Sequence, residues 1–230
     1  MNALTALAEV DLCNMGLSNL GISQAIQSFN DPSEYAKVCK FWYPKCRDQL
    51  LQKAPWNFAY SSLALTSDGS AVPNTQLAYP GWPFAYQYPN DCLQAIAVVP
   101  PTGMRLGPAF WQSWWWPYQG TRGWLPKIPF KVVQSQAVAG QKMILCDIPA
   151  PVYLFYIQSV TDTALYDPLF CEALGWEIAA KAGGPLRANA DRVQQAKSEA
   201  QMKRAEALAQ HLNEAQQDIE RVSPSISVRW

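Results

Sequence analysis

The sequence predicts an α+β fold in which helices at both ends of the chain enclose a central β-rich region. Near both ends, apolar residues recur at three- and four-residue steps, which is typical of amphipathic helices. From about residue 58 to residue 160, short apolar runs alternate with proline-rich turns, which is typical of strands. Consecutive strands joined by short turns favour antiparallel pairing. We therefore expect a helical bundle formed from the N- and C-terminal segments, a central antiparallel β insertion, a long C-terminal helix and an extended C-terminal arm.

Two helices are expected in the N-terminal part. The first spans residues 3–15 and is expected to stop at Gly16. The second spans residues 33–53, because Asp31 and Ser33 offer side-chain oxygens to the free N–H groups at a helix start. One side of this second helix is apolar and consists of Tyr35, Val38, Cys39, Trp42, Cys46, Leu50 and Leu51.

Prolines mark the course and the end of the second helix. Pro44 lies inside it, removes a backbone donor and is expected to kink it. Pro55 is expected to end it, because the residue before a proline is displaced from the α region.

The central region is expected to hold a series of strands. They span residues 58–66, 84–88, 93–99, 130–136, 141–148 and 152–160. Ala139 and Gly140 form the expected hairpin turn between the strands over 130–136 and 141–148.

Two helices are expected after the strands. The first spans residues 167–182, begins at Asp167 and Pro168, and ends at Gly183. The second is a long polar helix over about 187–221. Its narrow apolar seam is typical of a helix that packs beside one other helix, and it consists of Val193, Ala196, Ala200, Leu208, Leu212, Ala215 and Ile219.

The last nine residues alternate in polarity. Ile226, Val228 and Trp230 are separated by Ser227 and Arg229. An extended segment with this period can add to the edge of a sheet and place alternate side chains in pockets. A frayed terminus is the simpler alternative. We favour docking on a partner.

These elements divide the chain into four parts. Residues 1–57 form an N-terminal helical part, and residues 58–165 form a central β-rich domain. Residues 166–221 form C-terminal helices that pack with the N-terminal helices, and residues 222–230 form the extended arm.

Composition and charge exclude several function classes. Eighteen Lys and Arg residues balance eighteen Asp and Glu residues, so the chain lacks the basic surplus by which proteins bind duplex DNA. No run of about 18 apolar residues is present, so we expect no contact with a membrane. The N-terminus lacks the basic start of a signal peptide, so we expect folding in a cytoplasm.

Candidates for catalysis are few. The only histidine, His211, lies on the polar C-terminal helix, where a solvated side chain is the simplest interpretation. None of the six cysteines shows C-x-x-C spacing, so we interpret them as reduced core residues. No glycine-rich phosphate loop is present. We assign no catalytic, cofactor-binding or metal-binding residue and do not expect an enzyme.

An aromatic segment runs from Phe110 to Tyr118 and includes Trp111, Trp114, Trp115 and Trp116. Three interpretations fit it. The rings could form a flat platform for sugars, they could fill pockets of a protein partner, or they could pack in the core of the β-rich domain. Flanking proline and glycine residues favour a loop or broken strand, which can present side chains to a partner.

Three segments carry a pattern in a fixed order. The first contains Leu20, Gly21, Ile22, Ser23, Asp31, Ser33, Ala36, Cys39, Tyr43, Arg47, Asp48, Leu50, Leu51 and residues 55–59. The second contains Tyr86, Tyr88, Pro89, Asp91, Cys92 and Leu93, and the third runs from Tyr156 to Asp162 and on to Phe170. In this order and spacing the chain resembles the tail tubular protein A family, the adaptors of short-tailed bacteriophages.

The resemblance implies a structural virion protein that connects the head to the tail. Such an adaptor is expected to form a dodecameric ring between the portal and the tail nozzle, a tail tubular protein B-like partner. Tail fibres are further expected partners, and genomic DNA would pass through the channel without specific binding during ejection. The protein would be assembled in the host cytoplasm and located in the virion, at the head–tail interface.

Site residues follow from the resemblance and from the two aromatic segments. In this family the C-terminal arm grips the portal, which assigns portal binding to Ile226, Val228, Arg229 and Trp230. Trp111, Trp114, Trp115 and Trp116 are expected to face the nozzle or a neighbouring subunit. The alternative is a carbohydrate-binding tail module that uses the same tryptophans.

Overall fold

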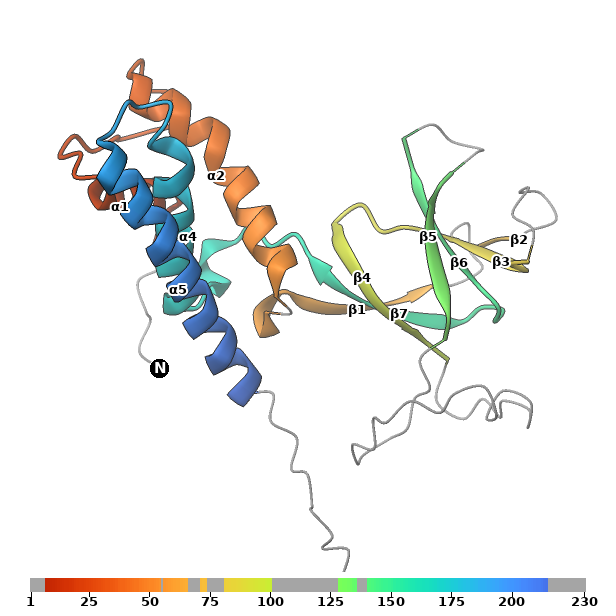
Figure 1. The fold of residues 1–230 in the computed structure, drawn as a ribbon. Helices are drawn as coiled ribbons and strands as arrows, with labels where there is room; N and C mark the ends of the chain where they lie inside the picture. The colour runs from red at the N-terminus through yellow and green to blue at the C-terminus, as the bar shows by residue number, and fades with distance from the viewer. Residues whose placement is uncertain are drawn as a thin grey trace, which may run out of the picture. The chain divides into compact units, whose positions relative to one another are not determined.

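The computed structural model describes residues 7–54, 56–65, 71–73, 81–100, 128–135 and 140–214. These residues form an α+β fold with four α-helices and two small antiparallel sheets (Figure 1). Backbone contacts divide the chain into two compact units. The helical unit takes in the described residues of Met1–Ser61, Asn90–Ala95 and Tyr156–Glu214, and the β unit those of Ser62–Pro89 and Ile96–Phe155.

The first helix, α1, spans Glu9–Asn19, so the expected stop at Gly16 was wrong. Gly16 lies buried inside the helix, where it allows close approach of a neighbouring helix. The chain turns out of the helix at Gly21, whose φ of +78° strains any residue with a Cβ. The N–H groups of Gly21 and Ile22 donate to the carbonyls of Ser18 and Leu17, which is the pairing of a Schellman motif.

The second helix, α2, spans Glu34–Lys53, as the sequence predicts. Ser33 is confirmed as its N-cap, since its hydroxyl accepts the N–H of Ala36. Asp31 does not share this role, which corrects the expectation. Its carboxylate accepts the N–H groups of Gln27 and Ser28 and so organises the turn before the helix.

Pro44 lies inside α2, and the helix continues beyond it to Lys53. Of the expected apolar side, Tyr35, Val38 and Trp42 are only half-buried. The buried side of α2 also takes in residues that the pattern left out, and it consists of Ala36, Cys39, Tyr43, Cys46, Arg47, Leu50 and Leu51.

Two sheets follow. The first has three strands in the order β1-β7-β4, which span Tyr60–Leu65, Val152–Gln158 and Cys92–Val99. The second has four strands in the order β2-β3-β6-β5, which span Ala71–Pro73, Phe84–Gln87, Lys142–Cys146 and Phe130–Gln134. The strand β2 was not predicted.

The hairpin between β5 and β6 is confirmed. The two strands pair antiparallel, with Val132 opposite Ile144. Gly140 has a φ of +83° beside the turn, a conformation that favours glycine. Ala139, the other expected turn residue, lies outside the described residues.

The C-terminal helices are α4, Pro168–Ala182, and α5, Ala190–Glu214. Asp167 and Gly183 flank α4 as predicted, with Pro168 as its first residue. The helix α5 begins later than the predicted residue 187, because the side chain of Asn189 accepts the N–H of Asp191 and caps it there. Residues 215–221 of the predicted helix lie outside the described part of the chain.

The helix α4 lies at the centre of the helical unit and contacts α1, α2 and α5 (Figure 1). Helices from both ends of the sequence therefore pack in the same unit. Small residues allow α1 and α4 to approach each other closely. A Cβ on Gly16 would lie 2.9 Å from Ile178 Cγ2, and one on Gly175 would lie 2.7 Å from Met15 Cε.

Candidate functional site

An aromatic cluster joins the end of α2 to the start of α4. Trp56 is fully buried, and its ring centroid lies 5.0 Å from that of Phe170 in an edge-to-face arrangement. Its indole N–H donates to the carbonyl of Leu50 at 2.9 Å. The ring centroid of Phe58 lies 5.0 Å from that of Phe170 and 5.7 Å from that of Tyr166. Such edge-to-face contacts add specific geometry to the burial of large apolar area.

A polar junction lies in the same unit and joins three distant segments. The Ser159 N–H donates to the carbonyl of Asp91 at 2.8 Å, and the Tyr156 hydroxyl donates to the Asp91 carboxylate at 3.4 Å. The Ser159 hydroxyl donates to the Asp48 carboxylate at 3.4 Å. Asp48 also pairs with Nε of Arg47 at 2.8 Å. Residues from all three segments of the family pattern therefore meet here.

Two buried phenols lie beside this junction. The Tyr166 hydroxyl donates to the Val160 carbonyl at 2.7 Å, and burial raises the pKa of Tyr166 to about 12. Burial also raises the pKa of Tyr43, whose hydroxyl has no hydrogen-bond partner among the described residues. Both phenols are therefore neutral near pH 7 and unsuited to act as a base.

A buried carboxylate joins three helices. Glu177 of α4 accepts Lys53 Nζ of α2 at 2.8 Å and Arg204 Nη1 of α5 at 3.1 Å. The Glu177 side chain is 10% exposed, so its charge needs these two cations. A second pair, between Glu172 and Lys203 at 3.2 Å, also joins α4 to α5. These pairs hold the three helices together, and both pairs of Glu177 involve its Oε1.

The cysteines are buried and reduced, as the sequence predicts. Burial raises the pKa of Cys46 to about 12 and the pKa of Cys146 and of Cys171 to about 11. Since the thiolate is the nucleophile, these thiols are unreactive at neutral pH.

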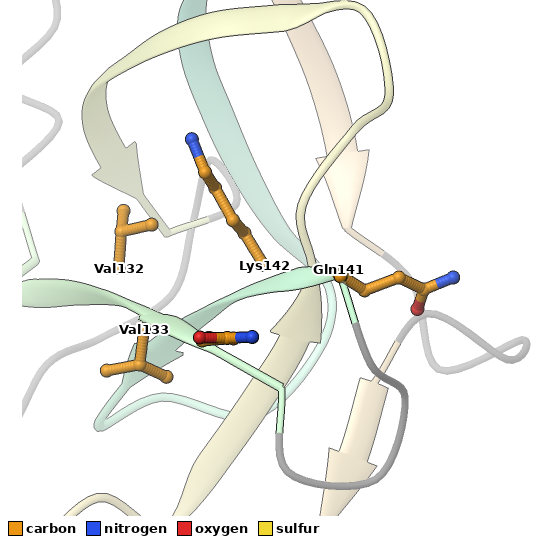
Figure 2. A pocket seen from close by; sticks show the side chains of 6 residues that line it. Val132, Val133, Gln141 and Lys142 are labelled. Carbon is orange, nitrogen blue, oxygen red and sulfur yellow. The ribbon is translucent and has the colours of Figure 1, made fainter.

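The β unit contains an open hollow of about 270 Å³ between β5 and β6. It is lined by Val132, Val133, Gln134, Gly140, Gln141 and Lys142. Figure 2 shows the Val132 and Lys142 side chains on one side of the hairpin and Val133 on the other. A hollow of this size with a single charged group does not enclose a small molecule, because ligand sites bury most of the ligand surface.

An aromatic and basic surface lies on the outer side of α2. The Phe41 side chain is 55% exposed, and its ring packs edge-to-face on Trp42 with centroids 5.1 Å apart. Lys45 Nζ lies 2.9 Å from the Phe41 ring centroid, a cation–π contact. Lys37 lies one turn before Phe41 and is exposed. We call Lys37, Phe41, Trp42 and Lys45 the Phe41 surface.

Sequence reasoning missed the Phe41 surface, although its signal was present. At 100° per residue, Phe41 lies on the opposite side of α2 from the buried Tyr43. Lys37 and Lys45 lie four residues before and after it, on the same side. An aromatic residue centred on the polar side of a helix is a candidate contact for a partner.

The residues predicted to bind partners lie outside the described residues. These are Trp111, Trp114, Trp115 and Trp116 of the aromatic segment and Ile226, Val228, Arg229 and Trp230 of the arm. His211 lies in α5. Within the described ranges, no group of three or more His, Cys, Asp or Glu side chains could hold a metal ion. None of the described helices is long and apolar enough to cross a membrane.

No protein-family model and no curated protein sequence matches this chain.

Proposed function

We propose that the chain is a structural protein of a phage virion, the head-to-tail adaptor of a short-tailed bacteriophage. In this proposal it forms a dodecameric ring that binds the portal on one side and the tail nozzle on the other. Genomic DNA passes through the ring without specific binding, which agrees with the formal net charge of zero.

One observation carries the proposal: the segments of the family pattern meet in one unit. Asp91 of the second segment bonds to Tyr156 and Ser159 of the third, and Ser159 bonds to Asp48 of the first. Trp56 of the first segment packs on Phe170 of the third. An adaptor fold built from these three segments requires that they contact one another, and this contact supports the proposal.

The chemistry of the same unit also favours a structural role. Its buried carboxylate, Glu177, is paired with two cations, and burial raises the pKa of the Tyr166 phenol and of the Cys46 and Cys171 thiols. Groups of this kind hold helices together and do not move protons at neutral pH.

Assembly on the portal explains how a short arm suffices for binding. A portal ring offers many equivalent sites, so each bound copy raises the effective concentration of its neighbours. We therefore expect a monomeric free chain and a ring that forms on the portal.

The test is the native mass, by light scattering, of the chain alone and mixed with the portal protein of the same genome. A shift to the mass of a portal with a bound ring is expected. A chain that stays monomeric beside an intact portal overturns the proposal, and a stable dodecamer without portal overturns the templating step.

Deletion of residues 222–230 tests the arm. We expect the shortened chain to fold and to bind the portal more weakly, because Ile226, Val228, Arg229 and Trp230 are lost. Circular dichroism checks folding and co-sedimentation with the portal checks binding. If binding is unchanged, the assignment of the arm is wrong.

A further inference from the structure

Two fully buried cysteines of different helices meet where α1 contacts α2. The exposed fraction of Cys13 in α1 and of Cys39 in α2 is 0%. The Cys13 thiol donates a hydrogen bond to the Cys39 sulfur, and no covalent bond joins the two sulfur atoms. By contrast, the thiols of Cys46 and Cys146 donate to backbone carbonyls, at 3.8 Å and 3.3 Å. Cys13 and Cys39 are therefore a pair of thiols in direct contact.

Neighbouring side chains fix the register of this contact. Glu9 lies about one turn before Cys13, and Tyr43 lies about one turn after Cys39. The pKa of Tyr43 is raised first by burial and then by nearby charges, of which Glu9 is one. Two adjacent turns of α1 therefore face two adjacent turns of α2 in opposite chain directions. The thiol contact is one position of an interface between the two helices.

The chain between the two helices is tied to α1 next to Cys13. The Asn14 amide donates to the carbonyl of Ile26 at 3.0 Å, and its oxygen accepts the Ile26 N–H at 2.8 Å. These two bonds hold the connecting segment on the helix that carries Cys13. They limit how far α1 and α2 can separate.

The hydrogen bond makes the two thiols chemically unequal. It lowers the pKa of Cys39 below the ordinary value of 9.0, although burial opposes this, and it raises the pKa of Cys13. By contrast, burial raises the pKa of Cys46 to about 12 and that of Cys171 to about 11. Because the thiolate is the nucleophile in thiol oxidation, Cys39 is the attacking sulfur. Cys13 is the thiol that resolves the oxidised intermediate.

We propose that Cys13 and Cys39 form a reversible disulfide that joins α1 to α2 when the chain meets hydrogen peroxide. This inference does not depend on the proposed function. The oxidant must be small, because both sulfur atoms are fully buried and are reached only when the interface opens locally. The two sulfur atoms must also approach each other to about 2.05 Å, the length of a disulfide bond.

The reaction is a two-electron oxidation in two steps. The Cys39 thiolate attacks one oxygen of the peroxide, so that an S–O bond forms, the O–O bond breaks and hydroxide leaves. Hydroxide takes the proton of Cys13, whose sulfur attacks the sulfur of the Cys39 sulfenic acid. An S–S bond forms, the S–O bond breaks, and a second hydroxide leaves and takes up the proton that Cys39 released on ionising. Two thiols and one peroxide thus yield one disulfide and two waters.

Peptide mapping of the full chain tests the pairing. The folded chain is treated with hydrogen peroxide, unfolded, alkylated at its remaining thiols, digested and analysed by mass spectrometry. We expect a linked pair of peptides that contain Cys13 and Cys39, with the alkyl label on the other four cysteines. The product should migrate as a monomer on a non-reducing gel, and dithiothreitol should restore all six thiols.

Oxidation of Met202 provides the internal control, since this side chain is 59% exposed and reports that the peroxide has acted. Six free thiols beside an oxidised Met202 overturn the inference. A second control is peroxide treatment in urea, where the short spacing of Cys39 and Cys46 favours links between these two. The same mixture of links in the folded and the unfolded chain overturns the role of the interface.

Substitution tests the order of the two steps. Cys13→Ser keeps a hydrogen-bond donor but cannot form the disulfide, so the sulfenic acid of Cys39 should accumulate and react with dimedone. Cys171→Ser is the matched control, because Cys171 is also buried in the helical unit, and it should leave the yield of the link unchanged. Circular dichroism checks that both variants fold, and Cys13→Ala replaces Cys13→Ser if the serine variant does not. A folded Cys13 variant without dimedone-labelled Cys39, or a link lost equally in Cys171→Ser, overturns the inference.

Discussion

The helical unit and the β unit are each stabilised internally by a different kind of contact. In the helical unit, side chains make the decisive contacts: Trp56 packs on Phe170, Glu177 binds two cations, and glycines permit the close approach of α1 and α4. In the β unit, β2, β3, β6 and β5 pair through their backbones, and Ala85, Met143 and Leu145 form a small buried core. Ion pairs between described residues all lie in the helical unit.

This difference indicates in which unit single side chains contribute most to stability. A helix–helix contact depends on shape and charge at a few positions, so one substitution can remove it. A sheet distributes its pairing over many backbone groups, and its outward side chains contribute little. In β5, for example, Val132 is 40% exposed although it lies in mid-strand. We therefore expect larger effects from single substitutions in the helical unit.

The largest effect is expected from alkaline pH. The folded-state pKa values of Cys46, Cys146 and Cys171 lie near 11 to 12, above the ordinary value of 9.0. Below pH 9 the thiols are protonated in both states. Above it the unfolded chain loses these protons first, so stability falls until the pH passes the folded pKa values.

Each pH unit between the two pKa values costs about 1.4 kcal/mol per group, so the three thiols together should lose on the order of 7 kcal/mol of stability by pH 11. Urea unfolding at pH 8, 9, 10 and 11 measures it. The free energy of unfolding of the variant Cys171→Ala should fall less steeply with pH than that of the unmodified chain, because one of the three thiols is missing. A midpoint that does not change up to pH 11 would contradict this prediction.

Trp56→Ala should cost about 3–5 kcal/mol, because it removes a fully buried ring and its hydrogen bond to Leu50. Denaturant unfolding followed by circular dichroism measures the change. Phe41→Ala is the control, since an exposed side chain should contribute within about 0.5 kcal/mol. Similar costs for both variants would show that the aromatic cluster does not hold the helical unit together.

Gly16→Ala and Gly175→Ala separate close backbone approach from helix propensity. On Gly16 a Cβ would lie 3.1 Å from the Gly175 carbonyl and 2.9 Å from the stiff Ile178, so a cost of about 1–3 kcal/mol is expected. On Gly175 the Cβ would meet the flexible end of Met15. That end can move, and alanine favours a helix by up to about 1 kcal/mol, so little net change is expected. Thermal unfolding of both variants checks the order.

Glu177→Gln should cost about 1–2 kcal/mol, because Lys53 and Arg204 lose a charged acceptor but remain partly hydrated. The matched control is Glu206→Gln, whose carboxylate pairs with Lys203 on the surface and should contribute within about 0.5 kcal/mol. Urea unfolding in low and high salt tests both variants. If Glu177→Gln loses no more stability than the control, the buried ion pairs do not stabilise the helical unit more than a surface pair does.

Tyr86→Phe is the corresponding change in the β unit and should cost about 1 kcal/mol. The Tyr86 hydroxyl donates to the carbonyl of Ile148 at 2.8 Å, and both groups are buried. Denaturant unfolding measures the loss. If Tyr86→Phe costs as much stability as Trp56→Ala, single side chains matter equally in the two units.

The sequence predicted the elements whose signals are local. Ser33 caps α2, Asp167 and Gly183 flank α4, and the β5–β6 hairpin forms beside Gly140. In each case the deciding interaction lies within a few residues along the chain. Apolar periodicity likewise predicted the α+β class, since helices and strands differ in period.

One wrong expectation depended on a residue distant in the sequence, and another on a competing local turn. Gly16 is buried against Ile178, which is far away in the sequence, so α1 continues through it. The Asp31 carboxylate accepts N–H groups of the preceding turn instead of those at the start of α2. The strand order β1-β7-β4 likewise depends on segments that are distant in the chain.

By itself the sequence determined the fold class and most element boundaries, because short-range hydrogen bonding and periodicity decide these. Only the tertiary structure decided that Asp48, Asp91 and Ser159 meet. It also decided that Phe41 remains exposed, since α2 packs against the rest of the unit with the opposite side. Contacts between distant segments depend on how whole helices pack, and local patterns do not encode that packing.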